Sequence, residues 1–134
     1  MTTTSKTAMR DIPGPVPDPE MQPWWDACKN GQFLVRHCRK CGENHFLPRT
    51  ICPFCFSDET EWKTAAGTAT IYTFSVMRRA HAPYVLAYVT LDEGPTVMTN
   101  IATSDVDAVH IGQRVRVAFE NTDTGQKLPL FAPI

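Results

Sequence analysis

The amino-acid sequence predicts a mainly β protein with a short N-terminal helix, a small cysteine-rich ribbon and a five-stranded barrel. Three observations support this fold class: one helical signal near the N-terminus, two Cys-x-x-Cys pairs ten residues apart, and a series of short strand signals after Gly67. The 134 residues suffice for one compact domain or two small modules and exclude a large multidomain enzyme. Because 43% of them are hydrophobic, we expect a substantial core.

Residues 1–17 are rich in threonine, proline and charge and have no apolar periodicity. This composition predicts a flexible arm, which is either a plain disordered tail or a segment that orders against a partner. The arm also lacks the apolar region and cleavage site of a secretory signal. No apolar run approaches the ~18 residues of a membrane span. We therefore expect a cytoplasmic protein that does not enter a membrane.

Residues 18–31 carry the helical signal. Asp18 is predicted to be the N-cap and Pro19 the first helical residue, and Gly31 is predicted to stop the helix. Between them, Pro23 marks a point at which the helix can break, because proline has no backbone N–H.

Two tryptophans and a cysteine lie within this helix. Trp24 and Cys28 share one helical face, whereas Trp25 points partly elsewhere. One indole can therefore enter the core while the other covers a neighbour. The sequence leaves open whether either faces a partner protein, where tryptophan is enriched. Cys28 stands outside the paired cysteines and is most simply a buried helical cysteine.

Residues 32–62 are predicted to form a zinc ribbon. Each Cys-x-x-Cys supplies two thiolates from one tight turn, and two such turns complete the tetrahedral shell that suits Zn(II). Redox disulfides are the alternative, but two dithiol motifs at ribbon spacing favour the metal. A closed four-sulfur shell leaves no position for water or substrate, so we expect a structural zinc. The predicted ligands are Cys38, Cys41, Cys52 and Cys55.

Short extended runs lead into each cysteine pair, Phe33 to His37 before the first and His45 to Arg49 before the second. His37 and His45 are alternative metal ligands by position. Since four cysteines already fill a zinc shell, we expect both histidines to be polar surface residues.

Residues 63–134 are predicted to form the barrel. Thr70 to Val76 and Arg114 to Phe119 alternate apolar and polar residues, as half-buried strands do. Tyr84 to Leu91 is apolar on both faces, as expected of a central strand. Further strands are predicted at Thr96 to Ile101 and around Leu128 to Phe131, and a loop or helical turn at Asp105 to Ile111. Five short strands predict a small closed barrel, for which the OB-fold is the simplest candidate.

The net charge of -1, from 13 Lys+Arg against 14 Asp+Glu, lacks the positive field of a general nucleic-acid or membrane-surface binder. Two local basic groups stand out. The first could hold phosphates of a nucleotide cofactor or a nucleic acid, or be a solvated ribbon surface; it comprises Lys29, Arg36, Arg39, Lys40 and Arg49, with Glu43 the single acid among them. The second, Arg78 and Arg79, lies where an OB-fold often meets its ligand, or is an ordinary loop.

No catalytic constellation stands out in the sequence. Ser75 and His81 lack a nucleophile elbow, Asp92 and Glu93 sit in a turn, and no glycine-rich phosphate loop precedes a helix. We therefore expect a chain that is not catalytic by itself.

The order of motifs along the chain nevertheless resembles a known family. It runs from Pro23-Trp24-Trp25 through Gly31-Gln32-Phe33 and the two cysteine pairs to Glu61-Trp62, Gly67-Thr68, Tyr72-Thr73-Phe74, Leu91-Asp92-Glu93-Gly94 and Ile111-Gly112. This pattern resembles the DUF35 family over roughly Pro19 to Pro133, and the family's fold is a helical segment, a rubredoxin-like zinc ribbon and an OB-fold. One departure is Leu47, where the family commonly has a second proline before Pro48, which bears on the local loop and not on the cysteines.

The resemblance implies a function. DUF35 proteins are typically partners of thiolase-like enzymes, among them archaeal acetoacetyl-CoA thiolases, polyketide-type acyltransferases and aldolases that shorten steroid side chains. It implies a non-catalytic subunit that helps form the acyl-CoA site of a lipid-transfer-type thiolase and stabilises the complex. The implied reaction is retro-aldol carbon–carbon cleavage of a steroid-type side chain or acyl transfer, with structural zinc and a shared CoA thioester.

Only the four cysteines carry over from the family position by position. A second set of residues is our own hypothesis from charge and position, as contacts for CoA phosphates: Arg36, Arg49, Arg78 and Arg79.

A stand-alone binder of single-stranded nucleic acid is the alternative function. OB-folds and ribbons both serve that role, and Tyr72, Phe74 and Tyr84 could stack on bases. The same aromatic residues fit a core position at strand periodicity. The near-neutral net charge opposes nucleic-acid binding.

Overall fold

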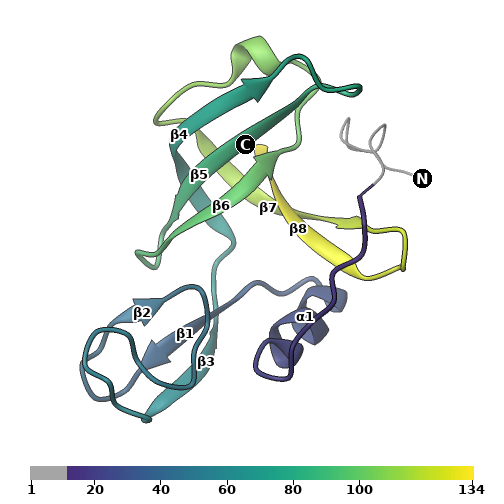
Figure 1. The fold of residues 1–134 in the computed structure, drawn as a ribbon. Coiled ribbons are helices and arrows are strands. Elements are labelled where there is room, and N and C mark those ends of the chain that lie inside the picture. The colour runs from purple at the N-terminus through teal and green to yellow at the C-terminus, as the bar shows by residue number, and fades with distance from the viewer. Residues whose placement is uncertain (1–11) are drawn as a thin grey trace.

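The structure is a computed structural model that describes residues 12–134. Residues 1–11 of the predicted arm lie outside the described residues. The described chain is mainly β: one short α-helix, a three-stranded sheet and a closed five-stranded barrel. Figure 1 shows the sheet below the barrel, with the helix beside the junction of the two. The predicted fold class is confirmed.

Helix α1 covers Gln22–Lys29 and begins later than the sequence predicts, because Met21 and not Asp18 is its N-cap. The Asp18 carboxylate instead accepts a bond of 2.9 Å from the Met21 N–H and closes a turn before the helix. Pro23 explains the shift. In a helix that started at Pro19, residue 23 would have to donate a backbone N–H, which proline lacks. In the first turn of α1 no such hydrogen bond is needed, so Pro23 does not destabilise the helix there.

Gly31 ends the helix, as predicted. It has a φ of +74°, and its N–H donates to the Cys28 carbonyl at 3.0 Å. A left-handed conformation directly after the last helical turn is the arrangement that favours glycine.

The ribbon sheet has the order β2-β1-β3, with β1 (Leu34–Cys38) in the centre and antiparallel to both neighbours. Strand β2 is Asn44–His45 and β3 is Thr60–Thr64. The predicted strand from His45 to Arg49 is therefore too long. Pro48 cannot donate to a ladder, and the chain leaves the sheet after His45 toward the second cysteine turn.

The barrel closes in the order β4-β5-β6-β8-β7, with β4 paired to β7. All five predicted strands are present, and the loop before β7 contains the short 3-10 helix η2 (Val106–Ala108). The strands are β4 (Thr68–Met77), β5 (Tyr84–Leu91), β6 (Thr96–Ile101), β7 (Arg114–Asn121) and β8 (Lys127–Pro133).

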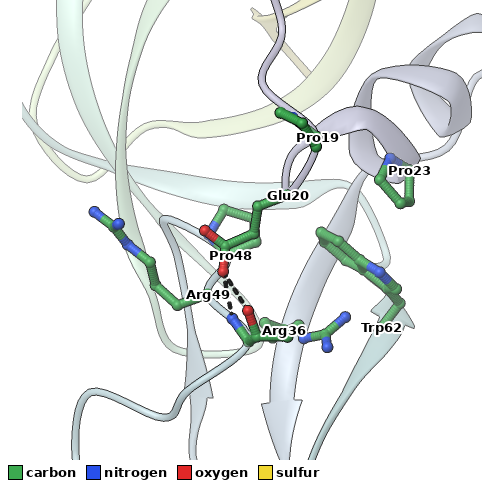
Figure 2. Close-up of a pocket in the computed structure, with 8 residues that line it drawn as sticks. Pro19, Glu20, Pro23, Arg36, Pro48, Arg49 and Trp62 are labelled. Carbon is green, nitrogen blue, oxygen red and sulfur yellow. Dashed lines mark hydrogen bonds between the residues drawn. The ribbon is translucent and has the colours of Figure 1, made fainter.

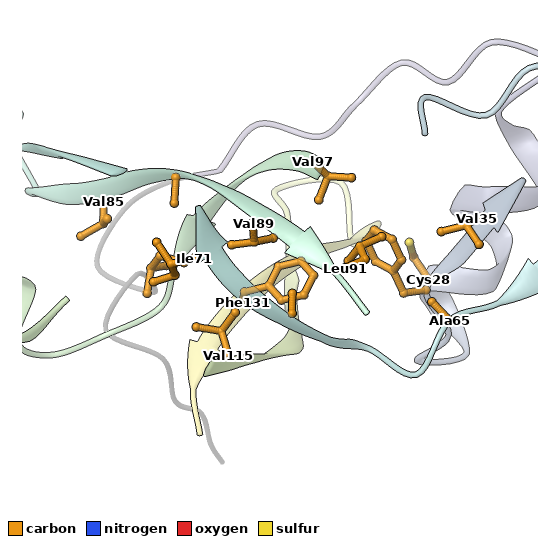
Figure 3. Packing of buried hydrophobic residues seen from close by; sticks show 14 of the residues in the cluster. Cys28, Val35, Ala65, Ile71, Val85, Val89, Leu91, Val97, Val115 and Phe131 are labelled. Atoms are coloured by element: carbon orange, nitrogen blue, oxygen red, sulfur yellow. The ribbon is translucent and has the colours of Figure 1, made fainter. Parts of the chain in front are cut away.

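One continuous hydrophobic core joins the barrel to the ribbon and the helix (Figure 3). Phe131 of β8 is buried in this core and lies with its ring 5.9 Å from that of Phe33, which precedes β1. Trp24 is only 4% exposed, and its Nε1–H donates to the Leu34 carbonyl at 2.9 Å. Trp24 thus faces the core, whereas Trp25 is half-buried with its ring 4.8 Å from that of Trp24.

An exposed ion pair ties the end of β5 to β7. Nη1 and Nη2 of Arg114 donate to the two carboxylate oxygens of Asp92, at 2.8 and 3.0 Å, and Thr68 donates to the same carboxylate. The Arg114 hydrogen bonds, followed by that of Thr68, lower the pKa of Asp92 from 3.8 to about 2.

We expect this pair to make stability depend on pH in acid. Because the folded-state pKa of Asp92 lies below its unfolded value of 3.8, its contribution is fully present above that pH and is lost as the pH falls toward 2. The Asp92→Asn variant should unfold at lower urea than the wild type at pH 6, and the two midpoints should converge as the pH falls to about 2. A constant difference across this range would contradict the assignment.

Candidate metal centre and basic pockets

Four cysteine sulfurs form a compact cluster at the tip of the ribbon. The end of β1 positions Cys38, the following turn brings back Cys41, and the second turn supplies Cys52 and Cys55. All four sulfurs lie within 4.8 Å of one another, with 3.6 Å between Cys38 and Cys55 and 3.7 Å between Cys41 and Cys52. A tetrahedral Zn(II) with bonds of about 2.3 Å needs sulfurs about 3.8 Å apart. The donor set therefore fits zinc.

The pKa values of the clustered thiols also favour a bound cation. The backbone N–H of Cys41, together with that of Lys40, lowers the pKa of Cys38 to about 7. The Glu43 N–H lowers the pKa of Cys41, but burial and the neighbouring thiols outweigh it and raise that pKa to about 12. Four adjacent thiolates repel one another unless a metal ion compensates their charge.

Neither histidine belongs to the cluster. His37 lies with Nδ1 2.7 Å from the Asn44 side chain. His45 is 4% exposed, so the expectation of a surface residue is wrong for it. Its side chain lies under the loop that follows β2, where its Nε2 accepts a bond of 3.4 Å from the Arg49 N–H, and burial lowers its pKa. A strand of two residues has too little periodicity to reveal which side chain turns inward.

Cys28, in contrast, lies in the core as predicted. It is fully buried, and burial raises the pKa of its thiol to about 12. A buried thiol of this kind stays protonated and unreactive, so Cys28 serves packing.

Arg36 and Arg49 line one pocket of about 410 Å³ between the start of α1 and the ribbon (Figure 2). Arg36 stacks on Trp62 at 4.7 Å and donates from Nε to the Thr60 hydroxyl at 3.2 Å. In Figure 2 its guanidinium and that of Arg49 point to opposite sides of the pocket. The two charges share a pocket without converging on one point.

Glu20 forms the acidic wall of this pocket. Its carboxylate accepts bonds from both the hydroxyl and the N–H of Thr50, at 2.5 and 2.7 Å (Figure 2). These bonds, the hydroxyl first, lower the pKa of Glu20, so it is ionised at neutral pH. A phosphate entering here would meet the exposed Arg49 beside a fixed negative charge.

Sequence reasoning missed Glu20, Thr50 and Trp62 as pocket residues. Trp62 reaches the pocket because it pairs with Arg36 across β1 and β3. Its place in an extended run was visible in the sequence, but the strand register that sets it opposite Arg36 was not.

Arg78 and Arg79 line a separate hollow of about 420 Å³ at the start of the β4–β5 loop. Arg78 is paired with Asp107 at 2.6 Å, while Arg79 is exposed. Figure 1 places this loop at the end of the barrel away from the ribbon. The four arginines therefore form two separate pairs.

The three aromatic residues of the alternative function do not form one exposed surface. Tyr72 is 66% exposed, but Phe74 is half-buried and packs against the core, and Tyr84 is half-buried. In the part of the chain that the structure describes, no helix is long and apolar enough to cross a membrane.

Comparisons with known proteins follow the same division of the chain. Residues 25–61 match the family described as "ChsH2, rubredoxin-like zinc ribbon domain", and residues 62–120 match "ChsH2, C-terminal OB-fold domain". A DUF35 domain-containing scaffold protein of Methanocaldococcus jannaschii is 35% identical over 103 residues, which cover 71% of this chain and 73% of that protein. A probable enoyl-CoA hydratase alpha subunit of Thermomonospora curvata is 30% identical over 115 residues, or 82% of this chain.

A solved structure, "Ltp2-ChsH2(DUF35) aldolase", superposes with a TM-score of 0.78 at 29% identity, covering 90% of this chain and 98% of that one. Fold and site together define a zinc ribbon joined to an OB-fold barrel. The chain belongs to the DUF35 family, the ChsH2-type scaffold proteins. It spans about a third, 36%, of the Thermomonospora curvata protein.

Proposed function

We propose that the chain is an accessory subunit of an enzyme complex that acts on acyl-CoA thioesters, and that its partner is a thiolase-like subunit of the lipid-transfer type. The superposition on the DUF35 chain of the Ltp2-ChsH2 aldolase, which covers 98% of that chain, carries this proposal. The Thermomonospora curvata relative, described as an enoyl-CoA hydratase subunit, adds support for work on CoA thioesters. A resemblance to an aldolase favours retro-aldol cleavage over acyl transfer.

In this proposal the zinc serves the fold. The ligands are Cys38, Cys41, Cys52 and Cys55, whose sulfurs have the spacing that a tetrahedral shell requires. When bound, the ion would offset part of the thiolate charge and hold the two turns together. The shell is complete with four sulfurs, so the chemistry of the acyl group belongs to the partner subunit, and this chain binds, orients and stabilises.

The arginine pairs are the candidate contacts for CoA phosphates. Within each pair one side chain is engaged, Arg36 by Thr60 and Trp62 and Arg78 by Asp107. Arg49 and Arg79 are exposed. We therefore expect these two to contribute more to a phosphate contact than their engaged neighbours.

Charge removal tests this expectation. A charged hydrogen bond to phosphate contributes about 1.5–3 kcal/mol, so Arg49→Gln or Arg79→Gln should each weaken acyl-CoA binding by the assembled complex by about ten- to a hundredfold. The matched control is Arg116→Gln on the exposed face of β7. Isothermal titration of the complex measures the affinity. Unchanged affinity in both variants would remove these arginines from the CoA site.

Affinity purification tests the function itself. The tagged chain, expressed in its own cells and purified at moderate salt, should retain a thiolase-like subunit in stoichiometric amount. An apolar interface persists as salt rises, whereas nucleic-acid binding falls steeply. Recovery of nucleic acid, with its release by salt, would favour the single-stranded nucleic-acid binder instead.

A further inference from the structure

The two cysteine turns of the ribbon are built alike. In the first, the Gly42 N–H donates to the Cys38 carbonyl at 2.9 Å, and in the second the Phe56 N–H donates to the Cys52 carbonyl at the same distance. In both, the amide of the first cysteine then donates at 2.9 Å to the carbonyl five residues later. Phe56 is therefore the structural counterpart of Gly42.

This equivalence puts a bulky residue in a backbone conformation that suits glycine. The φ angle is +82° at Gly42 and +65° at Phe56, and Phe56 is the single non-glycine residue with positive φ among residues 12–134. Aromatic residues are rare in this region because the Cβ crowds the backbone. The Phe56 side chain is 78% exposed, so packing in the core does not offset the backbone strain. A strained and exposed aromatic side chain points to a role outside the folded monomer.

Three large apolar side chains that precede Phe56 in the sequence are also exposed: Leu47 by 59%, Ile51 by 49% and Phe54 by 61%. We call these four residues the ribbon patch. Leu47 and Phe54 border one hollow of about 400 Å³, whose other walls are mixed: Pro53 and Pro95 are apolar, whereas Asn44, Arg49 and Thr96 are polar. Exposed apolar side chains close to a hollow that also has polar walls are typical of a protein-binding surface.

The charges beside the patch have both signs, since Arg49 lines the hollow and two exposed carboxylates follow Phe56 in the sequence. Asp58 and Glu59 are exposed two and three residues after Phe56, and Glu59 lies beside Arg39, whose N–H donates to its carbonyl at 2.8 Å. Nucleic acids and anionic membranes carry dense negative charge, which these carboxylates repel. A rim with both signs of charge fits a protein surface.

A second copy of this chain is a poor occupant as well. The four side chains expose on the order of 500 Å², so a symmetric contact between two patches would bury about 1,000 Å². Stable interfaces bury about 1,200–2,000 Å². The patch is large enough for one anchor region within a wider interface, and too small for a dimer of its own.

We propose that the ribbon patch docks on the enzyme subunit of the complex, with the rings of Phe54 and Phe56 inserted into an apolar pocket of that subunit. This rests on the proposed function. Buried aromatic anchors of this kind carry a large share of the binding energy of an interface.

The variant Phe56→Gly separates docking from folding. Glycine suits a φ of +65°, so the variant should bind zinc fully and unfold at the same temperature as the wild type or a few degrees higher. A second variant, Phe54→Ser, removes the neighbouring ring. The matched control is Ile111→Ser, which removes a side chain that is 67% exposed between η2 and β7.

The binding probe is the enzyme subunit that the tagged wild-type chain retains, identified by mass spectrometry and purified. We expect Phe56→Gly and Phe54→Ser each to raise its Kd at least tenfold, and Ile111→Ser to leave it unchanged. Kd values within twofold of wild type for both phenylalanine variants would overturn the docking proposal and leave the proposed function standing. A wild-type chain that retains no enzyme subunit would overturn the proposed function, and docking with it. Self-association of the wild type that Phe56→Gly abolishes in sedimentation would assign the patch to a second copy and overturn the proposal.

Discussion

Replacing Cys52 with serine is expected to abolish zinc binding and unfold the ribbon. Structural zinc sites contribute about 10–16 kcal/mol of apparent binding free energy, while a whole domain is stable by only about 5–15 kcal/mol. The part of the ribbon from β2 through the second cysteine turn has little else to hold it, since β2 is two residues long and Leu47, Ile51 and Phe54 are exposed. Zinc content by atomic spectroscopy should fall to near zero, and the amides of residues 34–64 should lose protection from hydrogen exchange.

The fifth cysteine provides the matched control. Cys28 is buried in the core and stands outside the sulfur cluster. Cys28→Ala should keep one zinc per chain and cost about 1 kcal/mol from lost packing. If Cys52→Ser kept its zinc, Cys52 would not be a required ligand; if it lost the zinc with an unchanged melting temperature, the ion would have no structural role.

Trp24→Ala is expected to be the most damaging substitution in the core. The indole of Trp24 packs against two rings at 5.6 Å, those of Phe33 and Phe46, and so connects α1 to the ribbon. Removing a buried tryptophan costs about 3–5 kcal/mol. For a chain of this size, that corresponds to a fall in melting temperature of roughly 10 °C or more.

A conservative variant divides this effect into its parts. Trp24→Phe keeps a ring in place but removes the Nε1–H that donates to Leu34, and should cost about 1 kcal/mol for the bond, plus some packing. Urea unfolding of both variants gives the comparison. A loss below 1 kcal/mol in Trp24→Ala would mean that α1 contributes little to the core.

Local features of this chain were predictable from its sequence. The sulfur cluster follows from spacing alone, because each Cys-x-x-Cys turn is closed within five residues. Strands β4 and β7 follow from the alternation of apolar and polar residues, and β5 follows from its apolar run. Gly31 and the turn at η2 likewise follow from local backbone chemistry.

Features that depend on register or on distant neighbours were not predictable. The start of α1 is a local exception: it lies three residues later than predicted, because Asp18 caps a separate turn and Pro23 fits only the first turn of the helix. The burial of His45 depends on a loop folding over it. The pocket around Arg36 joins Glu20 to Trp62, which are far apart in the sequence.

The central claim is that this chain works as the accessory subunit of a thiolase-like enzyme, and its most direct test is the mass of the native assembly. The tagged chain should be purified from its own cells at moderate salt and measured by native mass spectrometry, with the retained protein identified by its peptides. We predict a stoichiometric complex with a thiolase-like subunit, and one zinc per copy of this chain. Recovery of the folded zinc protein alone, or with nucleic acid in place of an enzyme, would contradict the claim.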